Sequence, residues 1–180
     1  MDYNLSKLQQ EVGEWADGQF PQQPVQNPLL GSVEESGELA EEFLSSGFDR
    51  TEVMDAIGDM VIYLCDFAYQ FDVDLGDAQQ HLDSVELQTQ CSTNTELTLE
   101  LSVANGKLIN SFLKQDQGIK QNEEGVGSNA DIEALAHILK AFHTYCDTSE
   151  FTVENCIDEA WSEVSDRDFD SSYDDQFNPY

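Results

Sequence analysis

Two neighbouring stretches of the sequence, residues 29–44 and 51–69, combine helical periodicity with a high density of carboxylates. Apolar residues recur in both stretches at intervals of three and four residues, which predicts two amphipathic helices. Asp59 is followed directly by the apolar run 60–64, so we expect its carboxylate to reach the packed region. The carboxylates that could do chemistry are Glu34, Glu35, Glu38, Asp55 and Asp59.

These carboxylates have no basic partner within their own stretches, which contain neither lysine nor arginine. A carboxylate withdrawn from water is costly unless it is paired, hydrogen-bonded or bound to a cation. Residues four apart share a helical face, so Glu34/Glu38 and Asp55/Asp59 can face each other if the helices run antiparallel across the turn at 45–50. Because hard divalent cations bind oxygen ligands, we predict a Mg²⁺ site, with Mn²⁺ as the substitute ion.

The helices that would position these carboxylates belong to an all-α chain. The Pro- and Gln-rich connector 18–28 cannot continue a helix. Ser45-Ser46-Gly47 ends the first acidic helix, and Thr51 with Glu52 begins the second in an N-capping pattern. Hydrophobic periodicity and internal similarity predict further helices over 4–18, 75–87, 102–113, 132–145 and 151–164.

The second half of the sequence repeats the first. Segment 102–113 aligns with 32–44 around Gly106 and Gly37, and segments 132–145 and 151–164 align with 54–67 and 73–86. The apolar positions are kept in the second copy, but most of the acids are lost. Ala104 stands at the position of Glu35, Lys107 at that of Glu38, and His137 at that of Asp59, while Glu133 keeps the acid of Asp55.

We therefore predict two tandem helical units. Residues 1–95 form the unit with the carboxylates, residues 96–169 form a degenerate unit without them, and residues 170–180 form a mobile acidic tail. One helical hairpin cannot bury both of its faces. The two units should therefore pack on each other as an intramolecular pseudo-dimer within a helix bundle.

Acidic residues dominate the composition. The chain has 37 Asp and Glu against 7 Lys and Arg, for a formal net charge of −30 at pH 7. Acids spread through the whole sequence are typical of a protein adapted to high salt, where counterions screen the repulsion. A decoy that imitates nucleic-acid phosphate is the alternative interpretation, although the acids follow no regular track.

The same charge disfavours duplex DNA and anionic membranes as partners. The sequence has no apolar run of 18 residues, and its first residues do not resemble a signal peptide. We therefore expect no nucleic-acid or membrane partner, and a cytoplasmic protein.

The cysteines show neither a CxxC motif nor the density of a disulfide scaffold. Cys65 falls in an apolar helix and is expected to be a small core residue. His143 and Cys146 are three residues apart, and with His137 and Cys156 they could form a transition-metal cluster. We favour a different role for His137, which lies beside an apolar stripe and should be a hydrogen-bonded core histidine.

The string VEESGELAEEFL, followed by DAIGDMVIYLCDFA, resembles the MazG-like nucleoside triphosphate pyrophosphohydrolases, an all-α superfamily with the pattern EExxE followed by ExxD. Residues 34–38 match EExxE, and Asp59 matches the final Asp. Ala56 stands at the Glu position of ExxD, and Asp55 would replace it, as in the DxxGD form of some relatives. EWADGQFP and PLLG upstream resemble short members from haloarchaea and their viruses. FLKQDQGI and AWSEVSDRDF in the second copy also resemble the family, so the resemblance covers most of residues 5–169.

The resemblance implies an enzyme that hydrolyses an NTP or dNTP substrate to the monophosphate and pyrophosphate with Mg²⁺. It implies a role as metal ligands for Glu34, Glu35, Glu38, Asp55 and Asp59. Glu35 or Glu38, or a metal-bound hydroxide, would then deliver the attacking water to the α-phosphorus.

Family members assemble from several subunits, and the second unit would take that part here. Lys107 or Lys114 would then reach the phosphate oxygens, although both could equally be surface lysines. Trp15 and Phe20 could stack on the base, but Trp15 also fits the apolar face of the first helix. The pseudo-dimers could pair further into a homo-oligomer.

Two other functions stay open. Ala56 and the loss of acids from the second copy favour a non-catalytic nucleotide-binding or regulatory protein. The charge alone favours an acidic interaction protein that mimics nucleic acid.

Overall fold

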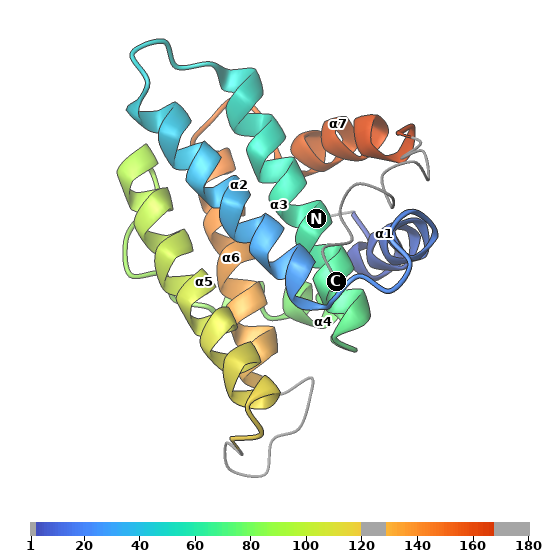
Figure 1. The fold of residues 1–180 in the computed structure, drawn as a ribbon. Coiled ribbons are helices and arrows are strands. Elements are labelled where there is room, and N and C mark those ends of the chain that lie inside the picture. The colour runs from blue at the N-terminus through green and yellow to red at the C-terminus, as the bar shows by residue number, and fades with distance from the viewer. Residues whose placement is uncertain (1–2, 120–128, 168–180) are drawn as a thin grey trace.

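The computed structural model describes residues 3–119 and 129–167, which form seven α-helices and one 3₁₀ turn (Figure 1). No strand occurs in these ranges, and the all-α prediction is confirmed. None of the helices in the same ranges is long and apolar enough to cross a membrane. The predicted acidic tail, 170–180, lies outside the described residues. The elements in order are α1 (Leu5–Gln19), α2 (Gln26–Leu44), α3 (Arg50–Gln70), α4 (Leu75–Gln80), the 3₁₀ turn η1 (Leu82–Ser84), α5 (Asn94–Asp116), α6 (Asn129–Asp147) and α7 (Val153–Ser165).

Side-chain caps determine where α3 and α7 begin. The carboxylate of Asp49 accepts a hydrogen bond from the backbone N–H of Thr51 at 2.9 Å. Asp49 is therefore the N-cap of α3, which begins one residue before the predicted Thr51. At α7, Thr152 and Asn155 form a capping box, in which each side chain accepts from the other's backbone N–H.

The predicted helix 75–87 is too long, because α4 ends at Gln80 and only a 3₁₀ turn follows it. Polar side chains in this region form hydrogen bonds with backbone carbonyl oxygens. The ring Nδ1 of His81 lies 2.7 Å from the carbonyl oxygen of Asp77, and the hydroxyl of Ser84 donates to the carbonyl of His81 at 2.7 Å. Such side-chain bonds compete with the helical backbone pattern and end the helix.

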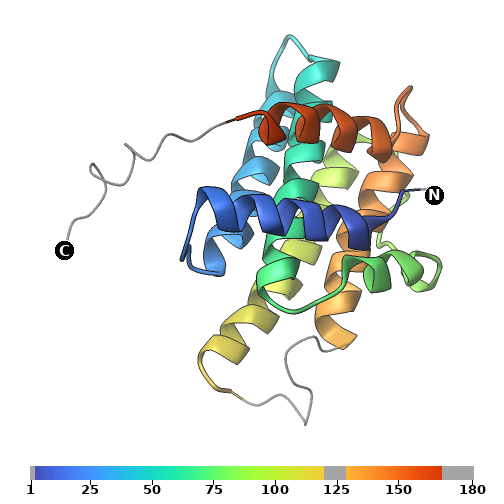
Figure 2. The ribbon, with the colours of Figure 1, turned by 90° about the vertical axis from the view of Figure 1, so that its right-hand side faces the viewer.

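Four long helices, α2, α3, α5 and α6, make up most of the fold (Figure 1). α2 packs against α3 and α5 packs against α6, so each consecutive pair forms a helical hairpin. The two hairpins meet in part through α2 and α5. α1 and α7 both cross α3 on the face shown in Figure 2.

The short helices that follow the two hairpins are exchanged between them. α4 follows α3 in sequence but packs on α6, whereas α7 follows α6 but packs mainly on α3. Each half of the chain thus covers the long helix of the other half. Such a reciprocal exchange is compatible with a pseudo-dimer of two similar units, and the two-fold relation between the halves stays a prediction.

Within the described residues, one cluster of buried apolar side chains runs through both halves of the chain. α3 lies at its centre, with α1, α2 and α7 packed around it. α7 approaches α3 so closely at Gly58 that a Cβ there would lie 2.3 Å from the carbonyl oxygen of Cys156. It would also lie 2.7 Å from the Cβ of Ala160. Glycine at position 58 is therefore what allows this helix crossing.

Candidate functional site

The five carboxylates singled out in the sequence gather where α2 packs on α3. Glu35 on α2 and Asp55 and Asp59 on α3 are half-buried, whereas Glu34 and Glu38 are exposed. The negative charges of the other four carboxylates all raise the pKa of Glu35. The structure therefore brings these five groups into one acidic cluster, as the helical spacing predicted.

Burial and mutual repulsion make ionisation of the carboxylates in the acidic cluster less favourable. Burial, and then the charges of Asp59 and Glu38, raise the pKa of Glu35 to about 8. Burial and the charge of Asp55 raise the pKa of Asp59 to about 6, against the opposing charge of Arg167. Carboxylates perturbed by burial and like charge are common at functional sites, and a nearby cation would lower both pKa values again.

α7 adds charged groups to the cluster that the sequence analysis did not assign. Burial makes the largest contribution to raising the pKa of Asp55. The negative charges of Glu163 and Glu159 raise that pKa further, and the positive charge of Arg167 lowers it. The guanidinium of Arg167 also bonds to the carboxylate of Glu163, one helical turn away. Arg167 is one of two arginines in the chain, and it lies near the cluster only because α7 crosses α3.

A cavity of about 120 Å³ adjoins the cluster and shares Asp59 with it. Trp15 and Phe20 line one part of it and contact each other edge to face, with ring centroids 6.0 Å apart. Trp15 also packs edge-on against Trp161 at 5.8 Å, so it is at once a core residue and a wall of the cavity. The full lining consists of Val12, Trp15, Ala16, Phe20, Gln23, Asp59, Ile62, Tyr63, Asp66, Val164 and Arg167.

Asp66 is a buried carboxylate in the wall of this cavity. It accepts hydrogen bonds from the side-chain amides of Gln23 at 2.6 Å and Gln70 at 2.7 Å. Burial raises its pKa, and the two amide hydrogen bonds oppose that shift. The sequence analysis missed Asp66, although it lies seven residues after Asp59 and hence on the same side of α3.

A second, more polar cavity of about 320 Å³ lies beside Asp55 and Glu38. Ala56, which stands where the MazG-like pattern has a glutamate, is part of its wall. Asp55 lines the same cavity, so a carboxylate is present there in place of the expected one. The remaining lining residues are Glu41, Glu42, Ser45 and Glu52.

The described side chains of the acidic cluster do not form a complete metal site. Within residues 3–119 and 129–167, no three His, Cys, Asp or Glu side chains are placed so that they could hold one metal ion. The Mg²⁺ site thus stays a prediction. The disfavoured alternative, a transition-metal cluster of His137, His143, Cys146 and Cys156, is not formed by these side chains either.

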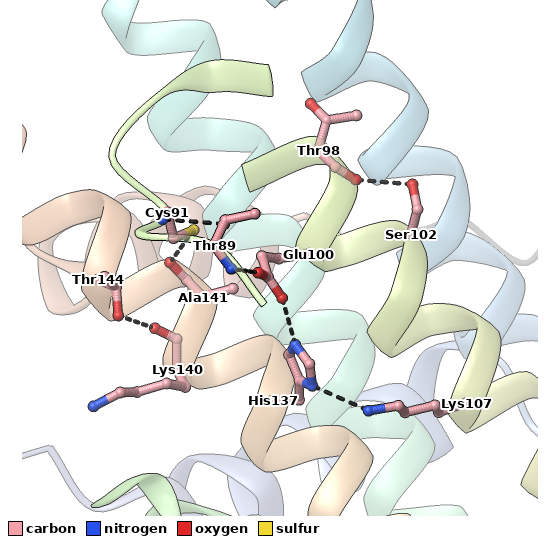
Figure 3. Close-up of polar contacts among 10 residues, drawn as sticks. All are labelled: Thr89, Cys91, Thr98, Glu100, Ser102, Lys107, His137, Lys140, Ala141 and Thr144. Atoms are coloured by element: carbon pink, nitrogen blue, oxygen red, sulfur yellow. Dashed lines mark hydrogen bonds and ion pairs between the residues drawn. The ribbon is translucent and has the colours of Figure 1, made fainter. Parts of the chain in front are cut away.

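A buried polar network joins α5 and α6 to the segment that precedes α5 (Figure 3). Nε2 of His137 lies 2.8 Å from a carboxylate oxygen of Glu100, and the other oxygen accepts the backbone N–H of Thr89 at 2.6 Å. Nζ of Lys107 lies 3.4 Å from Nδ1 of the same ring. His137 and Glu100 are both almost fully buried, which confirms His137 as a hydrogen-bonded core histidine.

The network involves two positions of the predicted repeat. Lys107 and His137 correspond to Glu38 and Asp59 in the repeat, and Glu38 and Asp59 also act on each other in the first unit. None of the contacts found in the described part of the chain joins Lys107 or Lys114 to the acidic cluster. Cys65 is fully buried, as expected of a core residue.

Comparisons with models of known protein families, with curated proteins and with solved structures found no match to this chain. The MazG-like resemblance therefore rests on the residues themselves.

Proposed function

We propose that the protein is a Mg²⁺-dependent hydrolase that splits nucleoside triphosphates into the monophosphate and pyrophosphate. One observation carries the proposal: the acidic cluster on α2 and α3 shares Asp59 with a cavity that has aromatic walls. A nucleoside triphosphate has an aromatic base at one end and a chain of phosphates, which binds cations, at the other. The cavity and the cluster match these two ends.

The cavity would bind the nucleoside. Trp15 and Phe20 offer ring surfaces on which a base can stack, and Asp66 with Gln23 offers hydrogen-bonding groups. Because Asp59 lines the same cavity, a nucleoside bound there would direct its phosphates toward the carboxylates. Arg167 lies along the same wall and would bind a phosphate oxygen.

The carboxylates would hold the cation. Their donors are all oxygen atoms, which fits the preference of Mg²⁺. Glu34 and Glu38 are exposed, so their side chains can rotate toward an ion shared with Asp59. Bound Mg²⁺ would neutralise charge on the phosphate chain and lower the pKa of a coordinated water.

Glu35 is the residue that we assign to proton transfer. It is half-buried and lies among the other four carboxylates of the cluster. In this position it would accept a proton from the water that attacks the α-phosphorus, and it would orient that water by a hydrogen bond.

The test is pyrophosphate release from a panel of NTPs and dNTPs with Mg²⁺ at molar KCl. We expect release from at least one of them, and its loss in Glu38→Gln and Asp59→Asn, which keep the size of the side chains and remove a ligand charge. Glu86→Gln removes an exposed acid outside the cluster and should leave the rate unchanged. Activity that persists in Glu38→Gln would contradict the assigned site.

A non-catalytic nucleotide-binding protein is the second candidate. It is favoured by Ala56 at the expected glutamate position and by the lack of three converged ligands in the described residues. Calorimetric titration with a non-hydrolysable triphosphate analogue separates the two candidates. Binding without pyrophosphate release from the natural nucleotides would favour the second.

A further inference from the structure

The outward face of α5 carries a line of uncharged residues, which we call the α5 stripe. It consists of Leu99, Ser102, Val103, Gly106, Asn110 and Leu113. Leu99 is 55 % exposed, Leu113 is 45 % exposed, and Val103 is also exposed. α5 packs mainly on α6 and α2, at the side of the fold away from α1 and α7 (Figure 1). Contiguous exposed apolar surface marks interaction sites, and Leu99 and Val103 lie one helical turn apart on this line, with Leu113 near its other end.

Gly106, in the middle of the stripe, has no packing role within the described chain. A Cβ at this position would meet no atom within 4 Å. Glycine in the interior of a helix lowers helix stability relative to alanine. At Gly58 the close crossing of α7 explains the glycine, and a close crossing by a helix of another molecule would explain Gly106 in the same way, because the distance between packed helices depends on the side chains at their contact.

The stripe is self-complementary about Gly106. Leu99 and Leu113 each lie seven residues from this glycine, on the same line of the helix. In an antiparallel pair of α5 helices that cross at Gly106, Leu99 of each copy meets Leu113 of the other. Ser102 meets Asn110 in the same way. An interface in which one patch contacts its own copy is the arrangement of a two-fold symmetric dimer.

Charge also favours a second copy as the partner. The chain has a formal net charge of −30, and a basic partner would be drawn to the carboxylates that cover it. No member of the α5 stripe is charged, so two copies can meet there without placing like charges opposite each other. Repulsion between the rest of the two molecules is screened at high salt.

We propose that two copies of this chain form a dimer through the α5 stripe, with the α5 helices antiparallel and crossing at Gly106. The proposal does not depend on the proposed enzymatic activity, since it rests on α5 and not on the acidic cluster.

α2 provides an internal control for this inference. Leu30, Gly37 and Leu44 have the same seven-residue spacing, and a Cβ at Gly37 also meets nothing within 4 Å. Glu34 and Glu41, however, stand on the outward side of α2 between these residues, and both are exposed. Two α2 helices crossing at Gly37 would bring these like charges together, so the dimer is assigned to α5.

The first experiment measures the mass of the full chain at molar KCl by light scattering during size-exclusion chromatography. We expect the mass of two chains for the wild type and of one chain for Leu99→Glu/Leu113→Glu. Ser162→Glu/Gln88→Glu, which adds two charges at exposed positions outside α5, should stay dimeric. A monomeric wild type, or a dimer that the α5 substitutions leave intact, overturns the proposal.

The second experiment uses cysteine cross-linking, which does not require a drastic substitution. All four native cysteines are buried, so an introduced surface cysteine is the main site for copper-phenanthroline oxidation. Gly106→Cys should cross-link into a disulfide dimer at least tenfold faster than Gly37→Cys. Equal rates, or faster cross-linking of Gly37→Cys, overturn the assignment to α5.

The direction of the helices is tested by mixing two variants. Leu99→Cys mixed with Leu113→Cys should cross-link between the two kinds of chain, whereas Leu99→Cys alone should not. Efficient cross-linking of Leu99→Cys with itself would indicate parallel helices and overturn the antiparallel arrangement.

Discussion

The crossing of α3 and α7 at Gly58 can be tested by adding one methyl group. In Gly58→Ala the new Cβ would lie 2.3 Å from the backbone carbonyl oxygen of Cys156, which cannot rotate out of the way as a side chain can. The helices must then separate, so the substitution should destabilise the fold and displace Arg167 from Asp59.

The size of the effect follows from two opposing contributions. Overpacking of a close helix contact costs about 1–3 kcal/mol. Replacing glycine by alanine within a helix adds about 0.5–1 kcal/mol to the free energy of unfolding. Because the obstructing atom belongs to the backbone, we expect the upper part of the first range and a net loss of about 2 kcal/mol in the free energy of unfolding. For a chain of this length, that corresponds to a fall in Tm of about 4–8 °C.

Gly37→Ala is the matched control. Gly37 also lies within a helix, but a Cβ there would meet no atom within 4 Å. Only the helix-propensity contribution applies, and the variant should gain about 0.5–1 kcal/mol.

The assay is urea unfolding at constant molar KCl, followed by circular dichroism, for the wild type and both variants. Urea is uncharged, so the ionic strength that screens the acidic surface stays fixed. If both substitutions change stability in the same direction, then Gly58 does not mark a close crossing, and the position of α7 beside the acidic cluster is wrong.

Three further predictions concern the cavity, the cation and the buried network. Phe20→Ala should raise KM for the nucleotide about 5- to 150-fold in steady-state assays, because a stacked base contributes about 1–3 kcal/mol, while Phe48→Ala, an exposed aromatic outside the lining of the cavity, should leave KM unchanged. Mg²⁺ at about a hundred times its Kd should add about 2.7 kcal/mol and raise Tm by about 5–10 °C in a thermal scan at constant KCl, and an equal rise in Glu38→Gln would show that the ion binds elsewhere. Glu100→Gln should lower the free energy of unfolding by about 1–3 kcal/mol at neutral pH. Burial raises the pKa of Glu100, but hydrogen bonds from His137 and Thr89 outweigh it and hold that pKa below its ordinary value, so the stability contributed by the carboxylate is present above about pH 4 and lost as the pH falls through the folded-state pKa. Urea titrations from pH 7 to pH 3 should therefore show that the difference in free energy of unfolding between wild type and Glu100→Gln shrinks on acidification. A constant difference would contradict the role assigned to the Glu100 carboxylate.

The acidic cluster was predictable because its geometry is local. Glu34 and Glu38, like Asp55 and Asp59, share a helical face by spacing alone, and a short turn brings two consecutive helices into a hairpin. Local spacing was equally informative about His137, whose position beside an apolar stripe in the sequence corresponds to a buried, hydrogen-bonded ring in the structure.

The helix predicted over 75–87 shows where local patterns mislead. Apolar spacing continued past Gln80, but the side chains of His81 and Ser84 bind backbone carbonyls and stop the helix. Such bonds depend on side-chain geometry that periodicity does not contain.

The sequence by itself determined the all-α class and the shared faces of the carboxylates, since helical periodicity acts over a few residues. Only the tertiary structure decided that α7 crosses α3 at Gly58 and brings Arg167 to Asp59. It also decided that Trp15 and Asp66 line one cavity, and that Lys107 lies against His137. These neighbours are distant in sequence, and the packing of helices, which brings them together, depends on the fit of whole surfaces rather than on the spacing of residues within one helix.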